Sequence, residues 1–256
     1  MKKTFQKSLA VLAAASVCSS MLLNFPSGTF SIHWNWQASA EESVEGIAID
    51  ATNFPDETFR TYVQENFDTT ADGILTESER EQVTEINVTS KEISDLTGVE
   101  YFTALQWLYC EYNQLTELDV RQNSALQWLY CDNNNLTKLD VSLNPELQAL
   151  ACYNNNLTEL DVRSNMALET LECYMNNLTK LDLSQNTALQ TLFCEDNNLT
   201  KLDLSQNTAL QMLNCYSNNL TALDLSQNSE LIDLACSNNT YSIALTGGTF
   251  DLSTLP

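Results

Sequence analysis

The chain has 256 residues, and its 34 acidic residues outweigh 11 basic ones to give a formal net charge of −23 at pH 7. Because so negative a surface repels phosphate backbones and anionic lipids, nucleic acid and membrane surfaces are excluded as partners. His33 is the only histidine, and the 6 glycines form no phosphate-cradling cluster, so histidine-dependent catalysis and nucleotide chemistry lack their residues. The composition therefore predicts a protein that is not an enzyme.

Residues 1–40 are predicted to be a secretory signal peptide. Three lysines precede an apolar run over residues 9–23, and Ala38-Ser39-Ala40 supplies a small-x-small cleavage site. The run is short and is interrupted by two serines, which argues against a membrane span. Cleavage would remove His33, and we expect a secreted or cell-surface protein with no membrane insertion after cleavage. A retained N-terminal anchor is the alternative.

Residues 41–82 are predicted to form a small helical cap. The stretch over residues 53–57 indicates a helix start, with a proline in the opening turn followed by acidic residues. Phe59, Val63 and Phe67 recur every four residues and predict one apolar helix face. Thr76 and Glu79 have the spacing of a capping box and predict a second helix.

The loop between these two helices has the spacing of an EF-hand calcium loop. The expected calcium ligands are Asp68, Thr70, Asp72, the carbonyl of Ile74, and Glu79. Thr70 departs from the pattern, because Asp or Asn is usual at that position and a hydroxyl offers only a neutral oxygen. We expect one calcium ion here and no other cofactor. The alternative is that the segment only caps the following domain, with Gly73 present for the turn.

A repeat of 21 residues fills most of the remaining chain. Residues 83–104 form an irregular first repeat, and residues 105–239 hold six full copies and a partial seventh of L-x-x-L-x-C-x-x-N-x-L-T-x-L-D-(V/L)-x-x-N. This pattern matches the leucine-rich-repeat signature, with Cys where a third Leu usually stands. It predicts an α/β solenoid, a leucine-rich-repeat right-handed superhelix with short parallel strands on its concave face. Residues 240–256 are expected to be a C-terminal tail or cap.

Three further columns recur at this period. The cysteines are expected to be inward-facing thiols that fill the core, because side chains of one column point the same way and do not converge on a metal. The asparagines are expected to hydrogen-bond loop backbone. For the aspartate column a calcium-binding ladder is the alternative to solvated turn residues. The three columns start at Cys110, Asn113 and Asp119, and a further turn column starts at Asn123.

The chain resembles secreted and cell-surface leucine-rich-repeat proteins of Gram-positive bacteria, the internalin-like group. The resemblance rests on repeats such as LQTLFCEDNNLTKLDLSQNTA and on the segment FPDETFRTYVQENFDTTADGILTESE, and it covers residues 47–245. It implies that the repeats mediate protein–protein contact, commonly adhesion. Relatives in that group usually continue into further domains or a wall-sorting signal, whereas this sequence stops at Pro256, so wall attachment is left open.

Outward-facing aromatic residues on the strand side predict the binding surface. Exposed aromatics in a contiguous patch are typical of recognition sites, and carboxylates between them favour a basic protein partner. The alternatives are cross-strand pairs that only stabilise the sheet, a carbohydrate-binding surface, and a structural spacer without a specific ligand. The predicted contact residues are Trp107, Tyr109, Tyr112, Trp128, Tyr130, Tyr153, Tyr174, Phe193 and Tyr216.

Overall fold

The computed structural model describes residues 22–25, 28–31 and 46–240, which fall into two units within residues 1–43 and 44–256. In the first unit, β1 (Leu22–Phe25) and β2 (Gly28–Ser31) pair in antiparallel fashion. The rest of the predicted signal peptide and the predicted tail after Thr240 lie outside the described residues. No helix in the described part of the chain has the length and apolar character needed to cross a membrane.

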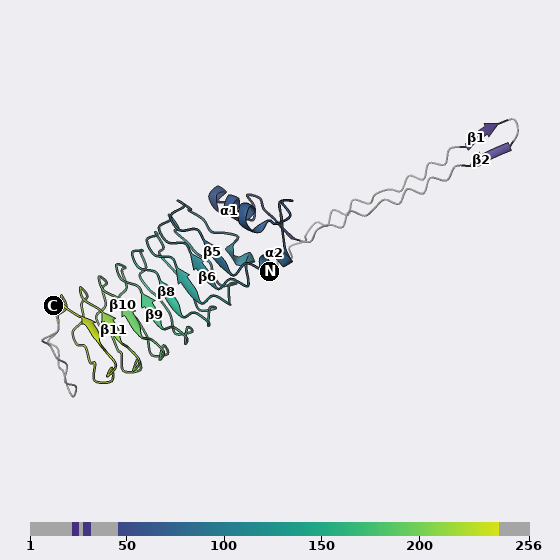
Figure 1. Ribbon diagram of the computed structural model, residues 1–256. Helices are drawn as coiled ribbons and strands as arrows, with labels where there is room; N and C mark the ends of the chain where they lie inside the picture. Colours follow the sequence, from purple (N-terminus) through teal and green to yellow (C-terminus); the bar gives the residue numbers. More distant parts are fainter. Residues whose placement is uncertain (1–21, 26–27, 32–45, 241–256) are drawn as a thin grey trace, which may run out of the picture. The chain divides into compact units, whose positions relative to one another are not determined.

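The second unit contains a solenoid built on one eight-stranded parallel sheet (Figure 1). Each strand pairs with the strands of the preceding and following coils, and from β6 onward the paired residues lie 21 positions apart. The predicted solenoid of 21-residue coils with short parallel strands is confirmed. The strands are β5 (Glu85–Asn87), β6 (Trp107–Tyr109), β7 (Trp128–Tyr130), β8 (Ala149–Ala151), β9 (Thr170–Glu172), β10 (Thr191–Phe193), β11 (Met212–Asn214) and β12 (Asp233–Ala235).

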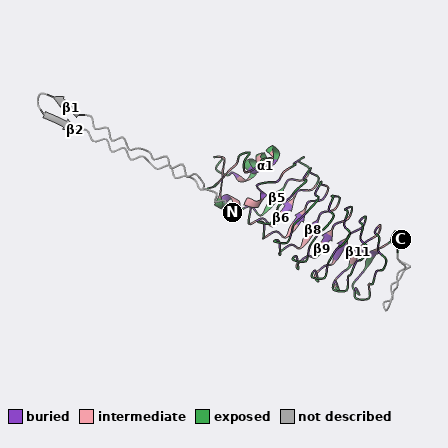
Figure 2. Cartoon of the chain, turned by 180° about the vertical axis from the view of Figure 1, so that it is seen from behind, coloured by how far each residue is buried: buried purple, intermediate pink, exposed green. Residues whose placement is uncertain are grey.

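Alternation along each short strand divides core from surface. In β6, Leu108 is fully buried while Trp107 and Tyr109 are half-buried on the opposite side, and Cys110 directly after the strand is fully buried again. The same positions repeat in the following coils, so leucine and cysteine columns form a continuous core (Figure 2). A single coil has no partner for this apolar stripe, and stacking supplies one.

The return path of each coil is made of turns, and residues 102–240 contain no helix. Buried asparagines replace the missing backbone pairing. The Asn134 side-chain amide donates to the carbonyl oxygens of Cys110 and Cys131, and its Oδ1 accepts from the N–H of Leu115. On the far side, the Asn144 amide donates to the carbonyls of Val120 and Asn123. The predicted structural role of both asparagine columns is confirmed, because each amide joins one coil to the preceding one.

The turn that follows each strand is left-handed at a non-glycine residue. Tyr112 has φ 55°, and the equivalent residue of every later coil lies between 49° and 53°. Asn133, Asn154 and Asn238 tolerate this conformation better than most side chains. The chain therefore leaves the strand direction three residues after each strand ends, and this turn limits the width of the surface formed by the strands.

The N-terminal cap joins two short strands to two helices. β3 (Gly46–Ala48) pairs in antiparallel fashion with β4 (Ile74–Thr76), which lies between α1 (Glu57–Phe67) and α2 (Glu77–Glu81). The predicted capping box of α2 is confirmed.

The expected start of α1 needs one correction. Asp56 is its N-cap and accepts from the N–H groups of Thr58 and Phe59, so Pro55 precedes the helix instead of lying in its first turn.

Aromatic contacts seat this cap on the first coil. Phe59 and Val63 of α1 are fully buried, as the four-residue spacing predicts. Phe67 meets Phe102 edge to face, with ring centroids 5.3 Å apart. Residues 83–104 contribute β5 and the 3-10 helix η1 (Val99–Tyr101), as expected of an irregular first repeat. Gly98 precedes η1 with φ 108°, and a Cβ there would collide with the Phe54 ring.

Candidate binding face

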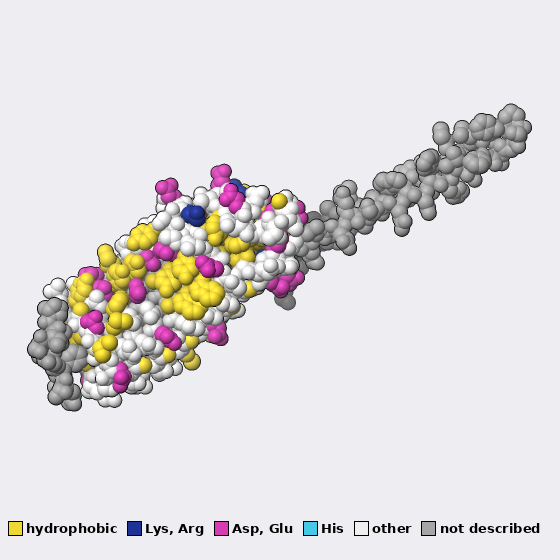
Figure 3. All heavy atoms as spheres, in the orientation of Figure 1, with side chains coloured by type: hydrophobic (Ala, Val, Ile, Leu, Met, Phe, Trp, Pro, Cys, Tyr) yellow, Lys and Arg dark blue, Asp and Glu magenta, His cyan; other side chains and the backbone are white. Residues whose placement is uncertain are grey.

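The outward side chains of β5 to β12, together with the residue two positions after each strand, form what we call the strand face. At its cap end two aromatic pairs stack between β6 and β7. The Trp107 and Trp128 rings lie 5.0 Å apart, and those of Tyr109 and Tyr130 lie 5.2 Å apart. Figure 3 shows hydrophobic side chains gathered in the middle of one side of the molecule, with carboxylates around and between them.

Five of the nine predicted contact residues lie on strands, and four lie beyond them. Tyr153, Tyr174 and Tyr216 stand two positions after their strands, where hydrogen bonds such as Asn154 N–H to the Tyr174 carbonyl keep the coils in register. Tyr153 and Tyr174 stack with centroids 4.2 Å apart. Tyr112 occupies the left-handed turn and is 57% exposed. Treating Tyr112 as an outward strand position was therefore wrong, because the chain has turned away by that residue.

Two alanines separate the aromatic groups. Ala149 pairs with Trp128 and Ala151 pairs with Tyr130, so β8 carries only small side chains next to the two stacks. On the other side β9 supplies Glu172. The next large aromatic side chains are those of Tyr153 and Tyr174, which stand two positions after β8 and β9 and stack on each other. Along the strand face, bulky aromatic positions thus alternate with small ones.

Two of the carboxylates among these aromatics are buried. Asp132 is only 3% exposed and Glu195 only 6%. Burial raises the pKa of Asp132, while hydrogen bonds from Asn133 and Tyr153 oppose that rise. Burial also raises the pKa of Glu195 to about 7. The sequence pattern indicates carboxylates between the aromatic residues but does not show that these two are buried.

Asn214 belongs to the same surface and was missed. It ends β11, in register with Phe193, and its Oδ1 is buried without a hydrogen-bond partner in the described part of the chain. Counting 21 residues on from Phe193 would have found the position. Its polar side chain, however, breaks the aromatic pattern that guided the search.

The cysteine column behaves as core. Cys110, Cys131, Cys152, Cys173 and Cys194 are fully buried and form no disulfide. Burial raises the pKa of all five thiols, so they stay protonated. The prediction of a spine of small apolar thiols is confirmed for these five residues, and thiols in this state are neither metal ligands nor nucleophiles.

The aspartate column lies away from the strand face and is exposed. Asp140 accepts from the N–H and hydroxyl of Ser142, and Asp161 pairs with Arg163 at 2.6 Å. The Ser142 contacts lower the pKa of Asp140, and the Arg163 guanidinium lowers the pKa of Asp161 to about 2. These two aspartates thus each bind a residue of their own turn, as expected of solvated turn residues, and the calcium-binding ladder stays an alternative.

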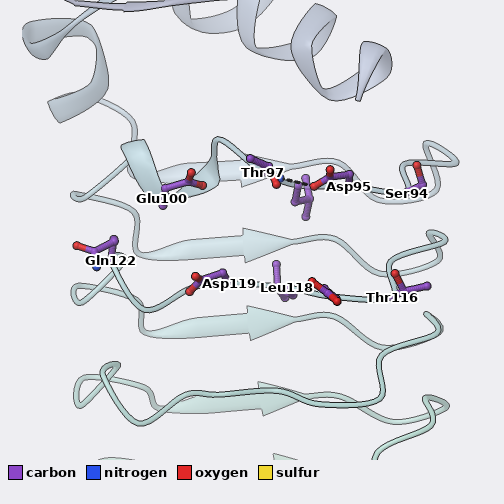
Figure 4. Close-up of a pocket in the computed structure, with 10 residues that line it drawn as sticks. Ser94, Asp95, Thr97, Glu100, Thr116, Leu118, Asp119 and Gln122 are labelled. Carbon is purple, nitrogen blue, oxygen red and sulfur yellow. Dashed lines mark hydrogen bonds between the residues drawn. The ribbon is translucent and has the colours of Figure 1, made fainter. Parts of the chain in front are cut away.

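Shallow grooves run between successive coils beside this column. The groove in Figure 4, of about 340 Å³, lies between the first two coils, where Asp95 and Glu100 stand opposite Thr116 and Asp119. Similar grooves recur along the solenoid. In the described part of the chain, no three His, Cys, Asp or Glu side chains are grouped so as to hold a metal ion.

In the cap, the predicted calcium ligands are engaged by the loop itself. Glu79 accepts from the N–H and hydroxyl groups of Thr69 and Thr76 and from the N–H of Thr70. Asp68 accepts from the N–H groups of Asp72 and Gly73 and from the Thr70 hydroxyl.

Burial raises the pKa of the Glu79 carboxyl, but the Thr69 and Thr76 hydrogen bonds outweigh it and lower that pKa to about 2. In this arrangement the carboxylates do not fit a calcium ion without giving up these contacts. The Asp72 carboxylate likewise accepts from the Ile74 N–H. The calcium site stays a prediction.

The coil geometry and the repeat together define a leucine-rich-repeat protein. A family model described as a leucine-rich repeat matches residues 132–149 and 153–165. Internalin J of Listeria monocytogenes serotype 4b (strain F2365) is 41% identical over 71 residues, which are 28% of this chain and 8% of that protein. The chain thus has the fold and the repeat of leucine-rich-repeat proteins and is similar to the internalins.

Two solved structures have a similar fold. The functional domain of InlJ from Listeria monocytogenes, described as including a cysteine ladder, is 36% identical with a TM-score of 0.64. The match covers 77% of this chain and 49% of that chain, so this chain spans about half the length of that relative. Internalin C2 from Listeria monocytogenes matches with a TM-score of 0.70 at 20% identity, over 78% of this chain and 92% of that one, which shows a shared fold.

Proposed function

We propose that this chain is an extracellular binding or adhesion module, secreted or held at the cell surface, that recognises a protein partner through its strand face. The observation that carries the proposal is the set of stacked, half-buried aromatic pairs on one face of a rigid sheet. Aromatic side chains fixed by their neighbours offer large contact area at little entropic cost.

Charge supports a basic partner. The formal net charge is −23, and carboxylates such as Glu111 and Glu172 lie among the aromatics of the strand face. Electrostatic complementarity steers association and makes it sensitive to salt. Catalysis is not part of the proposal, because the described strand face groups no nucleophile with a general base.

The double substitution Trp107→Ala and Trp128→Ala tests the proposal. It removes the larger stack while leaving Leu108, Leu129 and the cysteine core in place. We expect capture of protein partners from cell-surface extracts, compared by quantitative mass spectrometry, to fall at least about tenfold, since hot-spot aromatics each contribute 2 kcal/mol or more. The far-UV circular dichroism spectrum should be unchanged.

Leu143→Ala with Met166→Ala is the matched control, because both side chains are exposed but lie off the strand face. This variant should capture the same proteins as the wild type. Equal capture by the tryptophan variant would contradict the proposal and favour a spacer role. Tryptophan-dependent binding to a glycan array, without a protein partner, would favour the carbohydrate alternative.

A further inference from the structure

Two carboxyls of the strand face, those of Glu111 and Glu195, each have a buried oxygen without a hydrogen-bond partner in the described part of the chain, and Glu195 is the one whose whole side chain is buried. Glu195 follows β10 by two residues and is 6% exposed, and its Oε2 is buried with no hydrogen-bond partner in the described part of the chain. An unpaired carboxylate removed from water carries a penalty of several kcal/mol. A folded chain that keeps such a group on its candidate recognition face has a position in need of a donor.

The neighbours of Glu195 are fixed by the sheet register. The N–H of Met175 donates to the Glu195 carbonyl, and the N–H of Asp196 donates to the Tyr216 carbonyl. Tyr174, Glu195 and Tyr216 therefore stand side by side on three successive coils. In this row Glu195 stands between two tyrosines that are half-buried.

A second unpaired acceptor lies diagonally across from Glu195. Glu172, Phe193 and Asn214 are in register at the ends of β9, β10 and β11, two positions before the Tyr174, Glu195 and Tyr216 row. The Asn214 Oδ1 is buried and lacks a donor, as the Glu195 Oε2 does. The two oxygens belong to adjacent coils and to the same face, on residues that are diagonal neighbours across the sheet.

No cation of the described part of the chain satisfies these acceptors. The ion pairs there join Arg121 to Asp119 and Arg163 to Asp161, away from the strand face. A ligand group that complements this surface would need several N–H donors, a positive charge to pair with Glu172 and Glu195, and a flat surface that stacks on tyrosine. A guanidinium has all three properties, whereas an ammonium lacks the plane and a sugar hydroxyl lacks the charge.

We propose that Glu195, Asn214, Tyr174 and Tyr216 form a subsite that takes one arginine side chain of a protein partner. The guanidinium donates to the Glu195 Oε2 and the Asn214 Oδ1 and lies against a tyrosine ring, while Glu172 adds negative charge. This inference rests on the proposed function, because it takes the strand face to be the recognition surface.

The subsite should bind arginine in a pH-dependent way. The groups that face Glu195 are Glu172 and Tyr174 on the coil before, Asp196 on its own coil, and Asn214 and Tyr216 on the coil after. None of them is basic. Burial first, and then the charges of Asp196 and Glu172, raise the pKa of Glu195 to about 7. A bound guanidinium favours the ionised form, so binding should release a proton and strengthen as the pH rises from about 6 to 8.

The test uses the full chain and two short peptides, acetyl-Gly-Arg-Gly-amide and its isosteric neutral counterpart with citrulline in place of arginine. NMR chemical shifts of the protein report the site and the affinity. We expect saturable shifts around Glu195 with the arginine peptide and none with citrulline. Glu195→Gln should weaken binding at least about tenfold and remove its pH dependence. Asn214→Ala should weaken binding by a smaller factor.

The control Glu230→Gln removes an exposed carboxyl elsewhere and should bind the arginine peptide like the wild type. Shifts spread over many exposed carboxylates and unaffected by Glu195→Gln would show non-specific attraction and overturn the subsite. The Trp107→Ala and Trp128→Ala variant separates the two proposals. If it loses its protein partners but still binds the arginine peptide, the subsite stands; if the wild type shows tryptophan-dependent capture but no peptide binding, only the subsite fails.

Discussion

The cap and the strand face each bury one glutamate to the same extent, with opposite consequences. Glu79 in the cap is 7% exposed and Glu195 on the strand face is 6% exposed. The cap surrounds Glu79 with N–H and hydroxyl donors, and its pKa falls to about 2. On the strand face, burial and the charges of Asp196 and Glu172 raise the pKa of Glu195 to about 7.

The difference teaches that burial alone does not decide whether an acid is structural. Desolvation raises both pKa values. Hydrogen-bond donors then lower the pKa of Glu79, whereas the neighbouring charges of Asp196 and Glu172 raise the pKa of Glu195 further. A carboxylate whose oxygens are all used holds a loop together. A carboxyl with an unused oxygen on an aromatic surface is available to a ligand.

We expect the largest effect on stability from substituting Glu79 in the cap. Glu79→Gln replaces one accepting oxygen of the carboxylate by an amide NH2 group that faces other donors. We expect the free energy of unfolding of the cap to fall by about 3 kcal/mol at pH 7. Because the folded pKa of Glu79 lies below its unfolded value, this contribution is complete above about pH 4.5 and is lost as the pH falls towards 2. Amide hydrogen exchange of residues 46–82 measures this loss of stability in the cap.

Glu77→Gln is the control, because Glu77 lies in the same helix but is exposed. It should leave exchange in the cap nearly unchanged. Equal protection in the two variants would mean that the Glu79 hydrogen bonds do not hold the loop.

For Glu195 on the strand face, we expect the corresponding substitution to raise the free energy of unfolding instead of lowering it. Glu195→Gln should stabilise the protein by about 2 kcal/mol at pH 8.5 and by little at pH 5. Since the folded pKa of Glu195 lies above its unfolded value, the wild type is fully stabilised below about pH 4.5 and loses that stability as the pH rises through 7. Urea unfolding at the two pH values, with Glu230→Gln as the reference, checks the difference. A destabilised variant at pH 8.5 would show that Glu195 is a structural acid like Glu79.

Calcium gives the smallest expected effect. If the predicted loop exchanges its internal hydrogen bonds for an ion, titration calorimetry of the wild type should show heat that Asp68→Ala and Glu79→Ala both lose. At tenfold excess over Kd the ion would stabilise the cap by about 1.4 kcal/mol. Absence of heat from the wild type would leave the loop as a turn closed by its own donors.

Much of the fold was predictable because the 21-residue repeat determines which residues face the core and which strands pair. Leu108 and Cys110 alternate with outward residues, and the 21-residue spacing alone places Trp107 beside Trp128. The capping box at Thr76 and Glu79 was predictable for a similar reason, since it depends on residues three apart. Tyr112 was misplaced because nothing in the local pattern shows where the chain turns into the left-handed conformation.

By itself, then, the sequence determined the coil length, the inward columns and the face on which the aromatic residues stand, because these follow from spacing along one chain. Only the tertiary structure decided the state of the acids. Thr76 donates to Glu79 within a capping box that the sequence predicts, but the Thr69 donors reach Glu79 only once the loop closes, and Glu172 comes near Glu195 only once the coils stack.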